Sequence, residues 1–291
     1  MEQISPSPID TRQLFRPLNE KLLELLRSLT PEDWTRPTVA KLWNVKDVAA
    51  HLLDTQIRTM SSQGEKFTGE TPPTSSAYAV LVTWLNGLNS DWVKAFRRVS
   101  PSVLVWLHEM TSEPVTVYYE SQDLYKEAVF AVSWMGEEKS VNWMHVAREY
   151  TEKWHHQQQI RDATGRQGIM TREFFFPMID TFLRALPYAM RGADAPAGSV
   201  IRVSIQTDAG GDWYLGKGDN GWAFCAKTVN DQYAATVSLS PEIAWKLFSK
   251  SIRPQQIAAF IKAGGRPGAG LGGAAYGFRD GLALRVDGPE V

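Results

Sequence analysis

The spacing between apolar residues changes once along the chain, and this change determines the fold class. Up to about residue 165, apolar side chains recur every three or four positions, as on one face of an α-helix. From about residue 199 they alternate, as in SVIRVSIQTD, which is typical of a half-buried β-strand. We therefore expect a helical N-terminal domain over 1–168 and a small α+β C-terminal domain over 169–291.

Four long amphipathic segments in the first half predict an antiparallel four-helix bundle. They cover about 9–28, 45–61, 76–99 and 139–163. Asn44, followed three residues later by Asp47, has the spacing of a capping box at the start of the second segment. Pro101 opens a shorter helix that we expect to end near Met110, and residues 114–134 show no clear period.

The second half is expected to combine strands with short helices. After a helix at about 171–190, strands are predicted in SVIRVSIQTD, on both sides of the turn GKGDNG, and over 233–239. Ser240 and Pro241 then begin a helix, because serine caps and proline fits the first turn. A further helix is expected at about 254–263, and LALRVDG is a candidate last strand.

Composition limits the partners that we expect. The 291 residues carry 31 Lys and Arg against 32 Asp and Glu, so neither nucleic acid nor an anionic membrane is an expected partner. No apolar run approaches the ~20 residues of a membrane span. The start MEQISPSPIDTRQLF has no signal-peptide pattern, and the single Cys225 cannot form an internal disulfide. These features favour a cytoplasmic protein, either a monomer or a homodimer.

The helix expected at 139–163 has two chemically different sides. At 100° per residue, one side carries Trp143, Ala147, Tyr150 and Trp154. The opposite side carries His145, Glu149, Glu152 and His156. The aromatic side must pack into the core, whereas the polar side either faces solvent or faces a cleft.

Glu152 and His156 are spaced so that their tips converge and can bind one divalent cation. A catalytic zinc ion uses three protein ligands, so another helix must supply the third. His51 is the natural candidate, because it lies on the polar face of its own helix, and His108 is the alternative. His155 is placed off the polar side. Spacing alone leaves open that both polar faces are ordinary solvated surfaces.

Glu149 and His145 lie further back on the same polar side of this helix. Residues in that position can orient metal ligands or relay protons, as outer partners of metal sites commonly do. The same spacing is also expected if the two side chains simply face solvent, which is the interpretation that the spacing favours. Both interpretations of these two residues stay open at the level of the sequence.

Two stretches resemble the DinB-like metal-binding superfamily. LTPEDWTRPTVAKLWNVKDVAAHLLDTQIRTMS (29–61) has a D-W-x-x-P-T turn, a W-x-V-x-D-V helix start and a histidine in VAAHLLD. It is similar to the N-terminal region of the mycothiol-dependent maleylpyruvate isomerase branch. REYTEKWHHQQQIRDATG (148–165) resembles the last bundle helix of the superfamily. The resemblance covers roughly residues 10–165, and ATVSLSPEIAWKLFSK is similar in style to a small sterol-carrier-like C-terminal domain.

The resemblance implies a metal site formed by His51, Glu152 and His156. A His–Glu–His set is the pattern of the isomerase branch, whereas other members have a histidine where this chain has Glu152. The implied metal is Zn²⁺, with Ni²⁺ or Fe²⁺ as alternatives. The implied partners are a low-molecular-weight thiol of the mycothiol or bacillithiol type and an electrophilic substrate, in an isomerase or S-transferase reaction. An arginine of the C-terminal domain binds the acidic substrate in this branch, and Arg253 and Arg266 are candidates for it.

Two other functions remain open. The protein could bind a structural metal or a small molecule without catalysis, or it could be a hydrolase that uses zinc-bound water. A closed shell of four ligands would favour a structural metal, and a requirement for thiol would separate the transferase from the hydrolase. GAGLGG (268–273) matches the G-x-G-x-x-G spacing, but a helix precedes it, so no dinucleotide site is expected.

Overall fold

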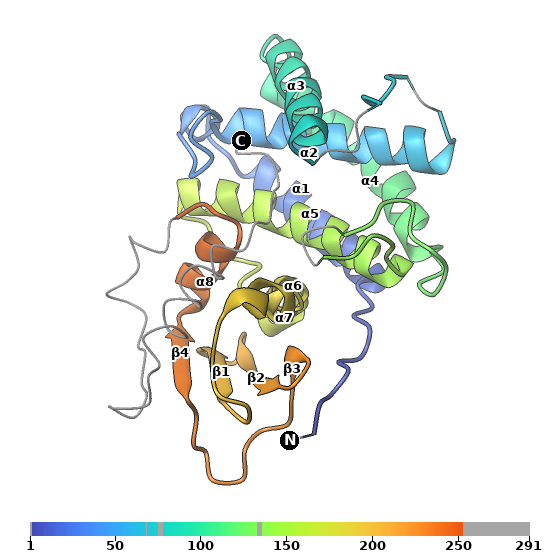
Figure 1. Cartoon of the computed structure of the whole chain (residues 1–291). Coiled ribbons are helices and arrows are strands. Elements are labelled where there is room, and N and C mark those ends of the chain that lie inside the picture. The colour runs from blue at the N-terminus through green and yellow to red at the C-terminus, as the bar shows by residue number, and fades with distance from the viewer. Residues whose placement is uncertain (1, 68, 75–77, 133–135, 253–291) are drawn as a thin grey trace. The chain divides into compact units, whose positions relative to one another are not determined.

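The computed structural model describes residues 2–67, 69–74, 78–132 and 136–252 (Figure 1). These residues form two compact units. The helical unit comprises 10–129 and 141–169, and the α+β unit comprises the described parts of 1–9, 130–140 and 170–252. The domain boundary expected after residue 168 remains a prediction.

Consecutive helices make up the helical unit, and the bundle expected from the sequence is confirmed. Its elements are η1 (Arg12–Leu14), α1 (Phe15–Arg27), η2 (Asp33–Thr35), α2 (Val45–Arg58), the π-helical turn η3 (Thr59–Gly64), α3 (Tyr78–Phe96), α4 (Pro101–Glu120) and α5 (Asn142–Thr164). Helix α1 packs against α4 and α5, and α2 packs against α3, α4 and α5. Leucine and valine side chains from α1, α2 and α4 fill the core between them.

Local signals fix several helix ends as expected. The Asn44 side chain accepts a hydrogen bond from the backbone of Asp47, and the Asp47 side chain accepts one from the backbone of Asn44. This capping box satisfies amide groups that a helix start would otherwise leave unpaired. Gly165 ends α5 in the left-handed conformation, with φ at 67°, where a glycine avoids the steric cost of a Cβ atom.

The helix that begins at Pro101 was expected to end near Met110. This expectation is wrong, because α4 continues to Glu120 through Pro114. An interior proline removes one helical hydrogen bond and disfavours the helix. Tertiary contacts of the last turns compensate for this loss. Tyr119 stacks on Phe15 with ring centroids 4.0 Å apart, and Asn19 donates a hydrogen bond to the buried hydroxyl of Thr116 at 2.6 Å.

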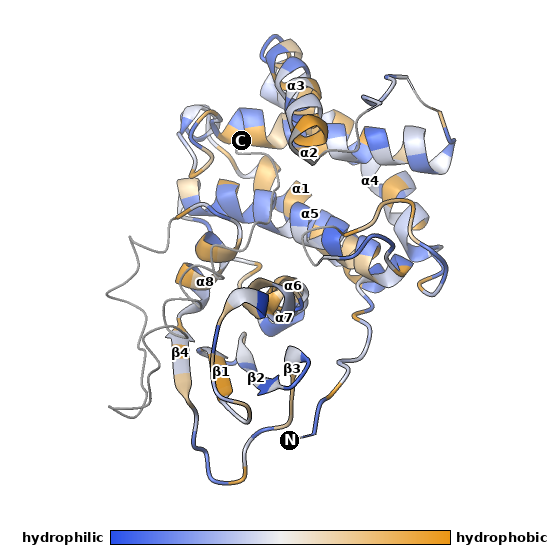
Figure 2. Ribbon diagram, in the orientation of Figure 1, coloured by the Kyte–Doolittle hydropathy of each residue, from blue (hydrophilic) through white to orange (hydrophobic). Residues whose placement is uncertain are grey.

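Helix α5 is both deeply buried and polar. In Figure 2 it is coloured mainly blue and white, yet most of its side chains are buried. Side-chain hydrogen bonds explain part of this burial. Gln157 donates to the carbonyl of Leu18, and Arg161 donates to the carbonyls of Lys21 and Gln167. On the polar side His145 and His156 are buried as well, whereas the Glu152 side chain is 38% exposed, so this side is largely buried and opens to solvent at Glu152.

The second unit contains a four-stranded sheet with strand order β3-β2-β1-β4. Its strands are β1 (Val200–Ile205), β2 (Gly211–Gly218), β3 (Gly221–Phe224) and β4 (Ala235–Leu239). Strand β1 pairs antiparallel with β2 and parallel with β4, and β2 pairs antiparallel with β3. The helices of this unit are α6 (Arg172–Leu183), α7 (Leu186–Ala189), η5 (Met190–Gly192) and α8 (Pro241–Phe248). The expected fold class, a helical bundle with a small α+β unit, is confirmed.

Other expectations fall partly outside the described residues. Ser240 caps α8 as predicted, since its hydroxyl accepts a hydrogen bond from the backbone of Ile243. The helix expected at 254–263, the strand LALRVDG, the segment GAGLGG and the candidate residues Arg253 and Arg266 all lie outside the part that the structure describes. Within that part, no helix has the length and apolar character needed to cross a bilayer.

Candidate metal centre

The three side chains proposed as ligands come from two helices that pack against each other. His51 belongs to α2, and Glu152 and His156 belong to α5. The imidazole centroids of His51 and His156 are 4.7 Å apart, with their planes at 76°. His156 Nε2 lies 3.5 Å from Glu152 Oε2. The structure therefore brings the imidazole of α2 against that of His156, which in turn lies beside Glu152. The candidate ligand atoms that lie within 4.8 Å of one another are those of Glu152, His155 and His156, and His51 is not among them.

His51 is a buried imidazole with an unused nitrogen. Its Nδ1 has no hydrogen-bond partner, and the indole ring of Trp43 covers it with ring centroids 4.8 Å apart. Burial lowers the pKa of His51 well below its usual value, and the nearby charges of His156 and Arg58 lower this pKa further. The ring is therefore neutral at pH 7, which is the form in which histidine binds a metal.

His156 is held in an orientation that frees its other nitrogen. Its Nδ1 lies 3.0 Å from Gln159 Oε1, and an amide oxygen can only accept, so Nδ1 carries the proton. In the neutral ring Nε2 then has a bare lone pair, which faces the Glu152 oxygen. Two lone pairs in this position repel, so either a second proton on His156 or a bound cation must lie between them. Outer partners such as Gln159 commonly orient metal-binding histidines in this way.

Glu152 is ionised and partly open to solvent. Burial on its own would raise its pKa. A proton on His156 Nε2, which would then donate a hydrogen bond to Glu152, and the charges of His155, His156 and Arg148 outweigh burial and lower the pKa to about 2. Its side chain is 38% exposed, whereas that of His156 is 6% exposed. Among His51, Glu152 and His156, the Glu152 carboxylate therefore supplies the negative charge and is the group most accessible to solvent.

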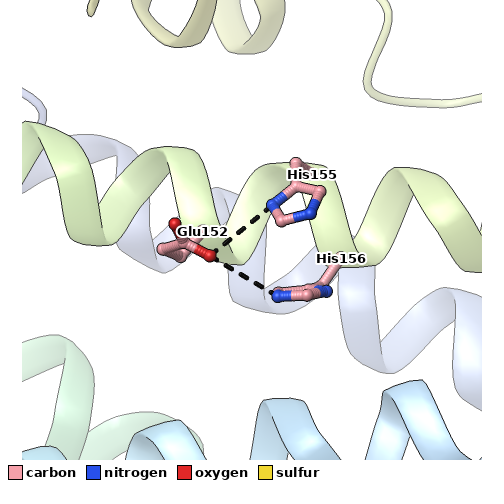
Figure 3. A group of neighbouring side chains, drawn as sticks. All are labelled: Glu152, His155 and His156. Atoms are coloured by element: carbon pink, nitrogen blue, oxygen red, sulfur yellow. Dashed lines mark ion pairs between the residues drawn. The ribbon is translucent and has the colours of Figure 1, made fainter. Parts of the chain in front are cut away.

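Contrary to expectation, His155 also lies against Glu152. Glu152, His155 and His156 each place one potential ligand atom within 4.8 Å of the other two. Figure 3 shows both imidazoles of α5 turned toward the same carboxylate oxygen, and His155 Nδ1 lies 3.7 Å from it. The i, i+3 spacing of Glu152 and His155 was the available signal, because both the third and the fourth following residue neighbour a given position on a helix.

His145 and Glu149 belong to a hydrogen-bonded network inside the bundle, and neither side chain lies on the solvent-exposed surface. Arg148 Nη2 donates to His145 Nδ1 at 2.9 Å and to Glu149 Oε1 at 2.7 Å. Tyr119 donates to the other Glu149 oxygen at 3.3 Å, and His145 Nε2 lies 3.0 Å from Gln63 Oε1. Arg148 connects this network to the candidate metal ligand Glu152, because its charge lowers the pKa of Glu152.

His108, the alternative third ligand, is used elsewhere. Its Nε2 lies 2.9 Å from the carbonyl oxygen of Ala49, and its Nδ1 lies 3.4 Å from the side-chain nitrogen of Gln56. Both ring nitrogens are therefore engaged, and burial lowers the pKa of His108 to about 4. This histidine links α4 to α2 and has no free nitrogen to offer a cation.

Lys153 is also buried in the bundle, which no residue pattern in the sequence indicates. The residue is 7% exposed, and no described residue pairs with its ammonium group. Burial alone lowers its pKa to about 7. An unpaired ammonium in such a place is costly, which makes Lys153 the least satisfied charge of α5.

Comparisons with known proteins bear on the family and the fold of this chain. The profile described as mycothiol maleylpyruvate isomerase N-terminal domain matches residues 15–161. The crystal structure of a histidine-to-alanine mutant of the mycothiol-dependent maleylpyruvate isomerase is similar, with a TM-score of 0.52 at 12% identity over 92% of this chain and 98% of that chain. The crystal structure of the mycothiol-dependent maleylpyruvate isomerase itself is similar with a TM-score of 0.51 at 13% identity, over 87% of this chain and 93% of that chain. No curated protein sequence matches.

At such low identity the two crystal structures establish the shared fold alone. The sequence profile covers the whole of α1 to α4 and most of α5, which includes every residue of the candidate metal centre. On this match, the chain belongs to the family of proteins with a mycothiol maleylpyruvate isomerase N-terminal domain.

Proposed function

We propose that this protein is a divalent-metal-dependent enzyme that activates a low-molecular-weight thiol for addition or transfer to an electrophilic small molecule. The observation that carries this proposal is the pair formed by His156 Nε2 and Glu152 Oε2, which face each other at 3.5 Å beside the unpartnered nitrogen of His51. Two neutral imidazoles and one carboxylate are a donor set that Zn²⁺ accepts readily, and Ni²⁺ or Fe²⁺ would also fit.

His51, Glu152 and His156 would hold the cation. When bound, the cation would lower the pKa of a coordinating thiol so that the thiolate predominates near neutral pH. Such a thiolate is the nucleophile that an isomerase uses by reversible addition, and that a transferase leaves attached to its product.

The surrounding residues prepare the site for this chemistry. Gln159 fixes the His156 ring, and Trp43 covers His51 and excludes water from it. The 38% exposure of the Glu152 side chain marks the side from which a small thiol would approach. Through Arg148, the His145–Glu149 network would help to keep Glu152 ionised and in place, which is a positioning role.

The thiol is expected to be mycothiol or bacillithiol, and the substrate an unsaturated acid such as maleylpyruvate, by similarity to the named isomerase structures. A thiol cosubstrate requires a reducing compartment. The single cysteine, Cys225, is buried and has a pKa raised by burial, so it fits the cytoplasm without competing as a nucleophile.

An assay of the zinc-loaded protein tests this function. We expect turnover of maleylpyruvate or a related unsaturated acid only when mycothiol, bacillithiol or glutathione is present. His51→Ala should abolish turnover, whereas Glu20→Gln, which changes an exposed carboxyl group of α1, should leave it unchanged. Hydrolysis without thiol would favour the hydrolase, and metal binding without turnover for any thiol would favour a non-catalytic protein.

A further inference from the structure

His155 is the one imidazole of the cluster that the proposed ligand set leaves without a role. Its side chain is only 13% exposed, and its Nδ1 is buried with no hydrogen-bond partner. A buried polar atom without a partner is uncommon in folded proteins and calls for an explanation.

The position of His155 is set by the same helix that positions Glu152 and His156. Its Nδ1 lies 3.7 Å from Glu152 Oε2, and the two histidine rings of α5 lie 3.9 Å apart between centroids. Figure 3 shows the two dashed contacts converging on one carboxylate oxygen. His155 is also close enough for its charge to act on His51 across the helix pair. Glu152, His155 and His156 therefore place ligand atoms around a common point, and the His51 ring approaches this group through its contact with His156.

We propose that His155 is a fourth protein ligand of the metal, so that this chain binds its cation through three imidazoles and one carboxylate. This inference rests on the metal site of the proposed function. Four protein donors complete a tetrahedral zinc shell, which is the arrangement of structural sites, so the proposed reaction requires that the shell open or expand to a fifth ligand. A thiol that enters by opening the shell displaces one donor, and His155 is the donor that the His51, Glu152 and His156 set does not require.

X-ray absorption spectroscopy of the full-length, zinc-loaded protein tests this directly, because it counts imidazole ligands without reference to activity. We expect three imidazoles in the wild type and two in His155→Phe, which keeps a ring of similar size. The affinity for Zn²⁺, measured by competition with a chelator, should fall at least about 10- to 100-fold, the loss that already follows removal of an outer partner.

Two further variants keep the test decisive. His155→Gln supplies a second version if the phenylalanine variant does not fold. His108→Gln, at a histidine whose ring nitrogens are engaged by Ala49 and Gln56, is the control that should retain three imidazoles. The fourth ligand would be overturned if the wild type shows only two imidazoles and this number falls in His51→Ala but not in His155→Phe. That result would leave the proposed function intact. Absence of bound zinc in the wild type would overturn both.

Discussion

Replacing Lys153 by methionine should stabilise the chelator-treated protein at pH 7 by about 4 kcal/mol. The pKa of this buried ammonium is about 7 in the folded state, and the value for an unfolded chain is about 10.4. Each unit of this difference corresponds to about 1.4 kcal/mol, so most of the penalty is present at pH 7. Methionine has a similar length, fills the same space and carries no charge.

The same difference predicts a pH dependence. Because the folded pKa is depressed, the penalty is complete below about pH 7 and fades as the pH rises toward about 10. The wild type should therefore gain stability over this interval, and Lys153→Met should lack that gain. Urea unfolding at several pH values measures both effects. Lys94→Met, at an exposed position of α3, is the control, and equal stability of wild type and Lys153→Met at pH 7 would contradict the prediction.

Zinc should stabilise the wild type strongly and the variant Glu152→Gln weakly. A ligand that binds only the folded state at about 1,000 times its dissociation constant adds about 4 kcal/mol to the free energy of unfolding. Glutamine keeps the shape of Glu152 but loses the charge that lies 3.5 Å from His156 and 3.7 Å from His155. Most of the stabilisation should therefore disappear.

Thermal unfolding with and without zinc measures this effect. Glu20→Gln makes the same chemical change on the exposed side of α1, and it should respond to zinc as the wild type does. An equal zinc response of Glu152→Gln and the wild type would show that the cation binds elsewhere.

Features that depend on neighbouring residues were predictable from the sequence. The capping box of Asn44 and Asp47, the left-handed Gly165 and the cap at Ser240 each involve groups within a few residues of one another. Such local signals act before tertiary packing and survive it. The change from helical to alternating spacing likewise identified the two kinds of unit.

Features that depend on packing were not predictable. Pro114 gives a local signal for a helix end, and only the stacking of Tyr119 on Phe15 shows why α4 continues. The polar side of α5 has the same spacing whether it faces solvent or a partner helix, so the burial of Lys153 required the fold. The position of His155 depends on how its side chain is turned, which residue spacing does not specify.

Metal analysis of the purified protein tests the central claim most directly. We expect close to one divalent cation per wild-type chain and essentially none in the double variant His51→Ala/His156→Ala, with circular dichroism confirming that both are folded. A wild type that takes up no cation, or a double variant that holds as much as the wild type, would contradict it.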